Sequence, residues 1–295
     1  MISEEILRSC LADHWNVPDA VVEAHNGGMN SATWFVTAGG ERWVAKAVTR
    51  DSRRSFVGGI ALAGHVEAAG VPAGLPVPTR RGDLVADVDG IPVALLSWVE
   101  GEGLTGATTS DQRLSGRTLG RVHQAVRDVS VTPVDQFHWV DTQAAHLAVR
   151  SWVQPLVAAA VAAYEVDHSS LSSGRLHCDP APEAFRLDHT TGVCGLIDWS
   201  AAVHGPLLYD LASAVMYVGG TDHADCLIET YLESRTVTEA ELAHGLPMML
   251  RFRWAVQADY FARRLATDDL TGIASAADNE KGLADARHWL VRLSI

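Results

Sequence analysis

The chain changes character about one third of the way along its length, and this change limits the folds that it can adopt. Up to about residue 98, short apolar or alternating runs typical of strands flank the turn sequences Gly39-Gly40 and Asp89-Gly90. After Gly101-Glu102-Gly103, most of the sequence has the periodicity of helices. We therefore expect an α+β fold with two lobes, a small antiparallel β lobe (residues 1–98) and a larger α-rich lobe (residues 99–295).

The hydrophobic pattern also predicts the individual elements. Ser3 is the expected N-cap of a helix over residues 3–15, and a second helix over residues 55–69 would end before Pro72. Strands are expected at 21–24, 33–36, 43–48, 84–86 and 92–98, and further helices near 109–128, 141–166, 207–218, 222–234, 238–266 and 275–293.

Composition narrows the class of partner. The 295 residues carry a net charge of −13, which argues against nucleic acid and suits either a cationic substrate or simple solubility. The four cysteines form no CxxC pair, so neither disulfides nor a zinc site is expected. The longest apolar run, residues 156–164, is too short to span a bilayer, and the acidic N-terminus does not resemble a signal peptide. We expect a cytoplasmic protein without a membrane partner.

Two aspartates inside the helix-rich part each follow an apolar, strand-like run. Asp179 ends Leu176-His177-Cys178-Asp179, and Asp198 ends Leu196-Ile197-Asp198. Either aspartate alone could be a turn or helix cap. Together they suit phosphoryl transfer, in which one carboxylate orients the attacking hydroxyl and another holds Mg²⁺ on the nucleotide. His177 is expected to brace this loop rather than to act as a base.

A lysine and a glycine-rich turn in the first lobe fit the same chemistry. Lys46 lies within an apolar strand, where it either faces solvent at a sheet edge or meets an anion such as a nucleotide phosphate. The turn Gly27-Gly28-Met29-Asn30-Ser31 comes before a strand, and its backbone N–H groups could bind phosphates. We expect nucleotide contacts at Gly28, Asn30 and Ser31.

Together these motifs resemble the aminoglycoside phosphotransferase and choline kinase-like family of small-molecule kinases. The similarity covers roughly residues 20–265 and includes the catalytic loop at residues 177–184 and the helix motif at residues 205–212. It implies a protein-kinase-like fold, with Mg²⁺ and with ATP or GTP as phosphoryl donor. The implied roles are Asp179 as catalytic base, Asp198 as metal ligand, Lys46 as phosphate ligand, and Ser97, Trp98 and Val99 as an adenine-binding hinge.

The sequence departs from the family pattern at three places. Ala184 stands where the family has a metal-binding asparagine, and the adjacent Glu183 is the candidate replacement ligand. Cys178 replaces the glycine beside Asp179. The helix glutamate that would pair with Lys46 falls near Gly59, and Glu67 is a weak alternative.

The resemblance implies phosphorylation of a hydroxyl on a small molecule. Candidate substrate contacts are Trp254, Gln257 and Asp259, although Trp254 could instead be core. Our leading hypothesis is an antibiotic-modifying O-phosphotransferase that acts on an aminoglycoside or another cationic natural product. The alternatives are a metabolic kinase of a small amino alcohol or sugar, and a nucleotide-binding pseudokinase. The expected partners are the nucleotide and the acceptor, and the sequence does not predict an oligomeric state.

Overall fold

The computed structural model describes residues 2–25, 31–131, 135–137 and 140–294. The chain forms two compact units. The first comprises residues 1–104, 125–135 and 183–203, and the second comprises residues 105–124, 136–182 and 204–295. Asp198 therefore belongs to the first unit and Asp179 to the second. The lobe boundary at residue 98 stays a prediction. Within the described residues, no helix is both long and apolar enough to cross a membrane.

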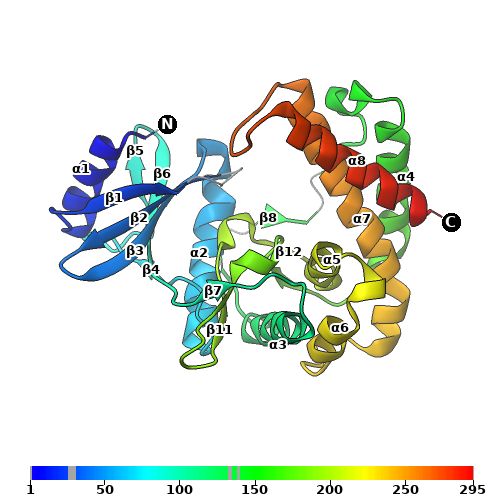
Figure 1. Cartoon of the computed structure of the whole chain (residues 1–295), viewed down its shortest axis with the longest axis horizontal. Coiled ribbons are helices and arrows are strands. Elements are labelled where there is room, and N and C mark those ends of the chain that lie inside the picture. Colours follow the sequence, from blue (N-terminus) through cyan, green and yellow to red (C-terminus); the bar gives the residue numbers. More distant parts are fainter. Residues whose placement is uncertain (1, 26–30, 132–134, 138–139, 295) are drawn as a thin grey trace. The chain divides into compact units, whose positions relative to one another are not determined.

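An antiparallel sheet forms the centre of the first unit (Figure 1). Its strand order is β1-β2-β3-β6-β4, and β5 pairs with β6. Both hairpin turns that the sequence predicted are present, because Gly39 and Gly40 adopt φ values of 58° and 86°, and Asp89 and Gly90 adopt 52° and 82°. The strands are β1 Val21–His25, β2 Ala32–Ala38, β3 Glu41–Ala47, β4 Pro76–Val77, β5 Ala86–Val88 and β6 Ile91–Ser97.

Two helices bury opposite faces of this sheet. Side chains alternate along a strand, so Ala45 of β3 packs with helix α1 (Glu4–Trp15), whereas its neighbour Lys46 points to the other face. On that second face, helix α2 (Arg53–Ala68) packs against the sheet through a separate apolar cluster. The α1 cluster includes Leu7, Leu11, Trp15, Val36 and Leu95, and the α2 cluster includes Phe56, Ile60, Val48 and Ala94.

A small three-stranded sheet in the first unit leads to Asp198. Its order is β11-β10-β7, formed by Cys194–Leu196, Phe185–Leu187 and Glu102–Gly103. The backbone N–H of Ile197 donates to the carbonyl of Ala184 at 2.9 Å, which fixes the chain just before Asp198. The short helix η5 (Trp199–Ala201) follows directly.

The second unit is helical around a long central helix. Helix α7 packs against α4, α5 and α8 (Figure 1). A small sheet of order β8-β12-β9 consists mostly of residues of this unit. The helices are α3 Thr109–Ala125, α4 Val153–Asp167, α5 Leu208–Tyr217, α6 Asp225–Leu232, α7 Glu239–Ala266 and α8 Ala276–Arg292, and the strands are β8 Asp135–Gln136, β9 Ser173–Leu176 and β12 Val203–Pro206.

The α+β class predicted from the sequence is confirmed, and one predicted helix is wrong in part. The expected helix over residues 141–166 is interrupted, because α4 begins only at Val153 and the short helix η2 (Ala145–Val149) precedes it. Pro155 explains the late start. Proline has no N–H and clashes with the preceding helical turn, so it is accommodated in the first turn of a helix and not in its interior.

Candidate active site

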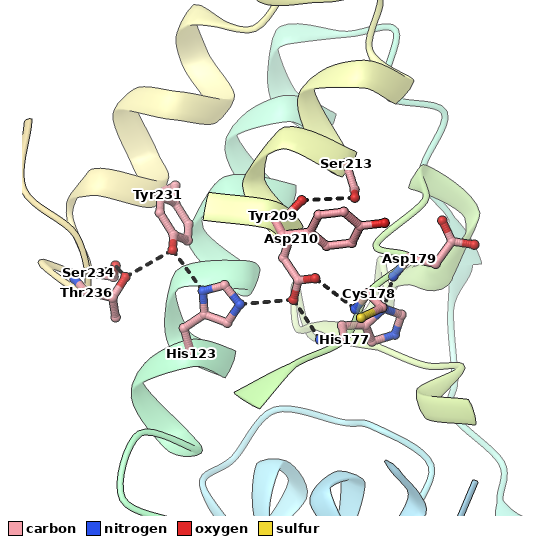
Figure 2. A network of polar contacts seen from close by, with 10 residues as sticks. All are labelled: His123, His177, Cys178, Asp179, Tyr209, Asp210, Ser213, Tyr231, Ser234 and Thr236. Atoms are coloured by element: carbon pink, nitrogen blue, oxygen red, sulfur yellow. Dashed lines mark hydrogen bonds and ion pairs between the residues drawn. The ribbon is translucent and has the colours of Figure 1, made fainter. Parts of the chain in front are cut away.

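The loop that carries Asp179 is held by a buried carboxylate. Asp210, in the first turn of α5, is fully buried and accepts hydrogen bonds from the backbone N–H groups of His177 at 2.7 Å and Cys178 at 2.8 Å (Figure 2). A carboxylate buried at this depth requires such donors. His177 is itself buried, and its Nδ1 accepts the backbone N–H of Asp179 at 3.3 Å. The geometry therefore gives His177 the bracing contact that we expected.

Cys178 occupies a backbone conformation that favours glycine. Its φ is 75°, in the left-handed region, where a side chain costs about 1–2 kcal/mol. This geometry gives a physical reason for the glycine in the family pattern. The hydrogen bond from its N–H to Asp210 opposes the strain, and its thiol is buried.

A buried polar chain continues from Asp210 away from the loop, and the sequence did not predict it. His123 Nε2 lies 3.1 Å from Asp210 Oδ2, and His123 Nδ1 lies 2.8 Å from the hydroxyl of Tyr231 (Figure 2). Because the carboxylate can only accept, Nε2 donates to it, and in a neutral imidazole Nδ1 then accepts from the Tyr231 hydroxyl. Thr236 in turn donates to the Tyr231 hydroxyl at 3.2 Å. Burial raises the pKa of Tyr231, so the phenol stays a donor.

The carboxylate of Asp179 meets two donors that the sequence also did not reveal. Its side chain is half-exposed (51%), and Oδ1 accepts from the hydroxyl of Tyr217 at 2.5 Å and from Nη2 of Arg253 at 3.3 Å. Arg253 is buried, and its Nε donates to Ser213 at 3.0 Å. Burial alone would lower the pKa of Arg253, but the neighbouring Tyr209, Tyr217 and Asp179 raise it, so the guanidinium stays charged.

Lys46 and Asp198 form an ion pair within the first unit. Nζ of the buried Lys46 contacts Oδ1 of Asp198, and Ser200 donates to the same oxygen at 2.8 Å. Lys46 is thus not a solvent-facing edge lysine, and the anion that it meets is Asp198. The Asp198 backbone is left-handed, with φ of 73°, and its side chain is half-exposed.

Gly59, which lies near the place where the family pattern has a helix glutamate beside Lys46, has no room for a side chain. A Cβ at Gly59 would lie 1.7 Å from the carbonyl oxygen of Trp199, because α2 packs directly on η5 at this point. The alternative, Glu67, accepts the backbone N–H of Ala73 at 3.1 Å and so joins the last turn of α2 to the loop that follows it. Asp198 therefore provides the negative charge beside Lys46.

The residues near Asp198 fit a magnesium-bound nucleotide with few protein ligands. Among the described residues, no three His, Cys, Asp or Glu side chains cluster as a metal site. Magnesium in kinases needs only one or two carboxylates, because phosphates and water supply the remaining ligands. The half-exposed carboxylate of Asp198 meets this need. Ala184 is buried and cannot coordinate, and Glu183, in the turn Pro182–Ala184, stays a predicted ligand.

The sheet face that carries Lys46 also has an apolar surface against which the purine ring of a nucleotide could pack. Phe35, Val44 and Leu96 are paired across β2, β3 and β6, and each is half-buried.

In the adjoining segment, which we expect to be the hinge, Ser97 Oγ and Trp98 Nε1 are buried without a hydrogen-bond partner among the described residues. Such atoms call for a ligand or water. A hollow of about 330 Å³ adjoins the hinge at Trp98, Val99, Glu67 and Pro72, and does not reach Lys46 or Asp198.

The glycine-rich turn lies mostly beyond what the structure describes. Gly28 and Asn30 are outside the described residues, and Ser31 is half-buried just before β2. Their contacts with a nucleotide stay predictions.

The three predicted substrate residues on α7 have different surroundings. Trp254 is buried and stacks on Trp289 of α8, with ring centroids 5.7 Å apart. Asp259 is buried and lies 2.6 Å from Nε2 of His146 on η2. Gln257 is half-buried and follows Arg253 by four residues, so both lie on one face of α7 about one turn apart. Of the three, Gln257 has the placement that best suits an acceptor contact.

Comparison with known sequences identifies related proteins. The model of the phosphotransferase enzyme family (APH) matches residues 21–244. A homoserine kinase from Allorhizobium ampelinum is 28% identical over 223 residues, which cover 70% of this chain and 67% of that protein. The chain thus spans about two thirds of the length of this relative.

Comparison with solved structures identifies the fold. The amicoumacin kinase hAmiN, solved with AMP-PNP, Ca²⁺ and Ami, superposes with a TM-score of 0.74 at 15% identity, covering 98% of this chain and 93% of that chain. A microcompartment-associated aminopropanol kinase superposes with a TM-score of 0.70 at 19% identity, covering 99% and 97%. At these identities the likeness concerns the fold alone, and it confirms the protein-kinase-like fold that we expected.

Proposed function

Since the chain belongs to the APH phosphotransferase enzyme family and is a small-molecule kinase with an alcohol acceptor, we propose that it transfers the γ-phosphoryl group of ATP to a hydroxyl of a small, amine-bearing molecule. The proposal rests on the exposure of the Asp179 carboxylate and on the fixed position of its backbone. Its carboxylate is half-exposed while the backbone beside it is fixed by the buried Asp210. Phosphoryl transfer depends chiefly on positioning, and this loop holds a carboxylate in place at the surface.

Each site residue then has a role that its surroundings support. Asp179 orients the acceptor hydroxyl and accepts its proton as the phosphoryl group is transferred. Lys46 contacts the nucleotide phosphates from β3, and Phe35, Val44 and Leu96 form the surface for the base. Asp198 holds Mg²⁺, which neutralises charge on the phosphates when the nucleotide is bound. Asp210 and His177 hold the loop and touch no reacting group.

The amine-bearing acceptor rests on the relatives and on charge. Homoserine and aminopropanol, named in two of the similar proteins, each carry an amine and a hydroxyl. The net charge of −13 favours the approach of a molecule with a cationic group. A small metabolic amino alcohol is therefore our first candidate for the acceptor.

An antibiotic acceptor is the second candidate. It rests on the name of one protein that shares the fold, the amicoumacin kinase hAmiN. The acceptor would then be an aminoglycoside or a related antibiotic, and its phosphorylation would make the host resistant.

A nucleotide-binding pseudokinase is the third alternative. The buried Ala184, which removes one metal ligand, is the observation that favours it.

One panel of acceptors distinguishes these alternatives. The purified protein is incubated with Mg²⁺-ATP and, separately, L-homoserine, 1-amino-2-propanol, choline, kanamycin and spectinomycin, and products are identified by mass spectrometry. We expect a phosphorylated amino alcohol. Transfer to an antibiotic alone would replace the first candidate with the second. Binding of ATP without transfer to any acceptor would favour the pseudokinase.

A further inference from the structure

Among the described residues, all hydrogen-bond donors to the carboxylate of Asp179 contact the same one of its two oxygens. Oδ1 accepts both the Tyr217 hydroxyl at 2.5 Å and Nη2 of Arg253 at 3.3 Å. No described residue donates a hydrogen bond to Oδ2. The contact with Tyr217 has the short length of an O–H group bonded to an anion, which is among the stronger hydrogen bonds in proteins. The two oxygens of the proposed base are therefore not equivalent.

The two donors are themselves fixed by neighbouring elements. Nε of Arg253 donates to Ser213 at 3.0 Å, and Ser213 donates to the carbonyl of Tyr209 at 3.0 Å. Arg253 also donates from Nη2 to the Tyr217 hydroxyl at 3.3 Å, and its guanidinium lies 5.8 Å from the centre of the Tyr217 ring. Because Arg253 is buried between the packed helices α5 and α7, the donors have little freedom to follow a moving carboxylate.

We propose that Tyr217 and Arg253 are positioning residues that hold Asp179 by Oδ1 and thereby present Oδ2 to the acceptor hydroxyl. The inference rests on the proposed function, which it refines by naming the accepting oxygen and the residues that select it. Neither Tyr217 nor Arg253 is required to touch the acceptor.

The physical benefit is orientation. A carboxylate at the surface can rotate, and a rotated carboxylate no longer faces the attacking hydroxyl. Misplacement of a reacting group by about 1 Å can cost on the order of 100-fold in rate. Rotation of the Asp179 carboxylate would break the hydrogen bonds that Oδ1 accepts from Tyr217 and Arg253. The guanidinium fork reaches Asp179 through Nη2 while its Nε donates to Ser213, and the single nitrogen of a lysine cannot occupy both places.

Kinetics of three variants test this role with the acceptor that the panel identifies. Tyr217→Phe removes one hydroxyl at a half-exposed site, so the protein is expected to fold. Loss of this one hydrogen bond to a charged group should lower kcat about tenfold and leave the KM for ATP unchanged. Arg253→Met should lower kcat by about 100-fold. Arg253→Lys should restore only part of that loss, because it keeps the charge without the fork.

A matched control separates positioning from general structural damage. Tyr260 lies on α7, and its hydroxyl accepts from a buried arginine, Arg264, at 3.3 Å, as the Tyr217 hydroxyl on α5 accepts from Arg253. Tyr260→Phe removes the same group without removing a hydrogen bond to Asp179. We expect its kcat to equal that of the parent. A fall in kcat for Tyr260→Phe as large as that for Tyr217→Phe would overturn the positioning role.

A structural readout makes the test independent of the acceptor. Crystal structures of the parent and of Tyr217→Phe, grown under one condition, report the side-chain torsion of Asp179. We expect one carboxylate orientation in the parent, and a rotated or split carboxylate in the variant. An identical, single orientation in both would overturn the inference, as would an unchanged kcat. If no acceptor is phosphorylated, the proposed function fails, and the crystal structures still decide whether these residues position Asp179.

Discussion

Gly59 gives the sharpest test of how α2 is placed against the segment that follows Asp198. In Gly59→Ala, the new Cβ would lie 1.7 Å from the Trp199 carbonyl oxygen, 2.8 Å from its carbon and 3.3 Å from Cβ of Ala202. Because real Cβ atoms essentially never approach within 3.0 Å, α2 and η5 must separate by about 1.3 Å. The obstructing atoms are backbone, so no side-chain rotation relieves the clash.

The expected size follows from two opposing contributions. Overpacking of this kind costs about 1–3 kcal/mol, whereas alanine in place of glycine inside a helix gains about 1 kcal/mol. Gly64 on the same helix shows the second contribution alone, because a Cβ there would lie 3.7 Å from Leu75, an ordinary contact. The difference between the two variants therefore measures the cost of overpacking. We expect Gly64→Ala to be more stable than the parent by up to about 1 kcal/mol, and Gly59→Ala to be less stable than Gly64→Ala by about 1–3 kcal/mol.

Urea denaturation followed by far-ultraviolet circular dichroism measures both variants and the parent. The free energies of unfolding are compared at equal m-values, so that a difference in midpoint reports stability. If Gly59→Ala were as stable as Gly64→Ala, α2 could not pack on η5 as closely as the structure shows. The explanation for the missing glutamate beside Lys46 would then fail with it.

Three further substitutions address the site. Asp179→Asn should abolish transfer and leave nucleotide binding largely intact, which isothermal titration with an ATP analogue checks; unchanged turnover would refute the assignment. Asp210→Ala should lower the free energy of unfolding by about 3 kcal/mol, because the N–H groups of His177 and Cys178 and the His123 ring lose a buried anionic partner; a loss below 1 kcal/mol in urea denaturation would contradict this reasoning. Glu183→Gln should raise the Mg²⁺ concentration needed for half-maximal activity, and an unchanged metal titration would exclude Glu183 as the ligand that replaces asparagine.

Elements with local causes could be predicted from the sequence. The Gly39-Gly40 and Asp89-Gly90 turns require left-handed backbone, and the observed φ values of 52–86° meet that requirement. Ser3 caps α1 by accepting the N–H of Ile6 at 3.2 Å, as its position before an apolar stripe predicted. Asp179, Asp198 and Lys46 could be proposed as site residues because each lies at a recognisable place in a short motif.

The partners of these residues could not be predicted, because no local pattern joins them. Arg253 is 74 positions from Asp179, and His123 is 87 positions from Asp210. Residue type alone is no guide, since Trp254, next to Arg253, is core, stacked on Trp289. The roles of the buried Arg253 and His123 can be inferred only from the packed structure, which shows the carboxylate that each side chain contacts.

The missing helix glutamate beside Lys46 has a physical cause in the packing of α2. Gly59 lacks a side chain because α2 lies on the Trp199 carbonyl, and Lys46 therefore has no helix glutamate beside it. A buried lysine still needs a counter-charge, and the first unit supplies it from Asp198, the aspartate directly before Trp199. If Asp198 also holds the metal, as we propose, Lys46 and Mg²⁺ must share one carboxylate. The packing at Gly59 would then couple the placement of α2 to nucleotide binding, because a shift of η5 would carry Asp198 away from both cations.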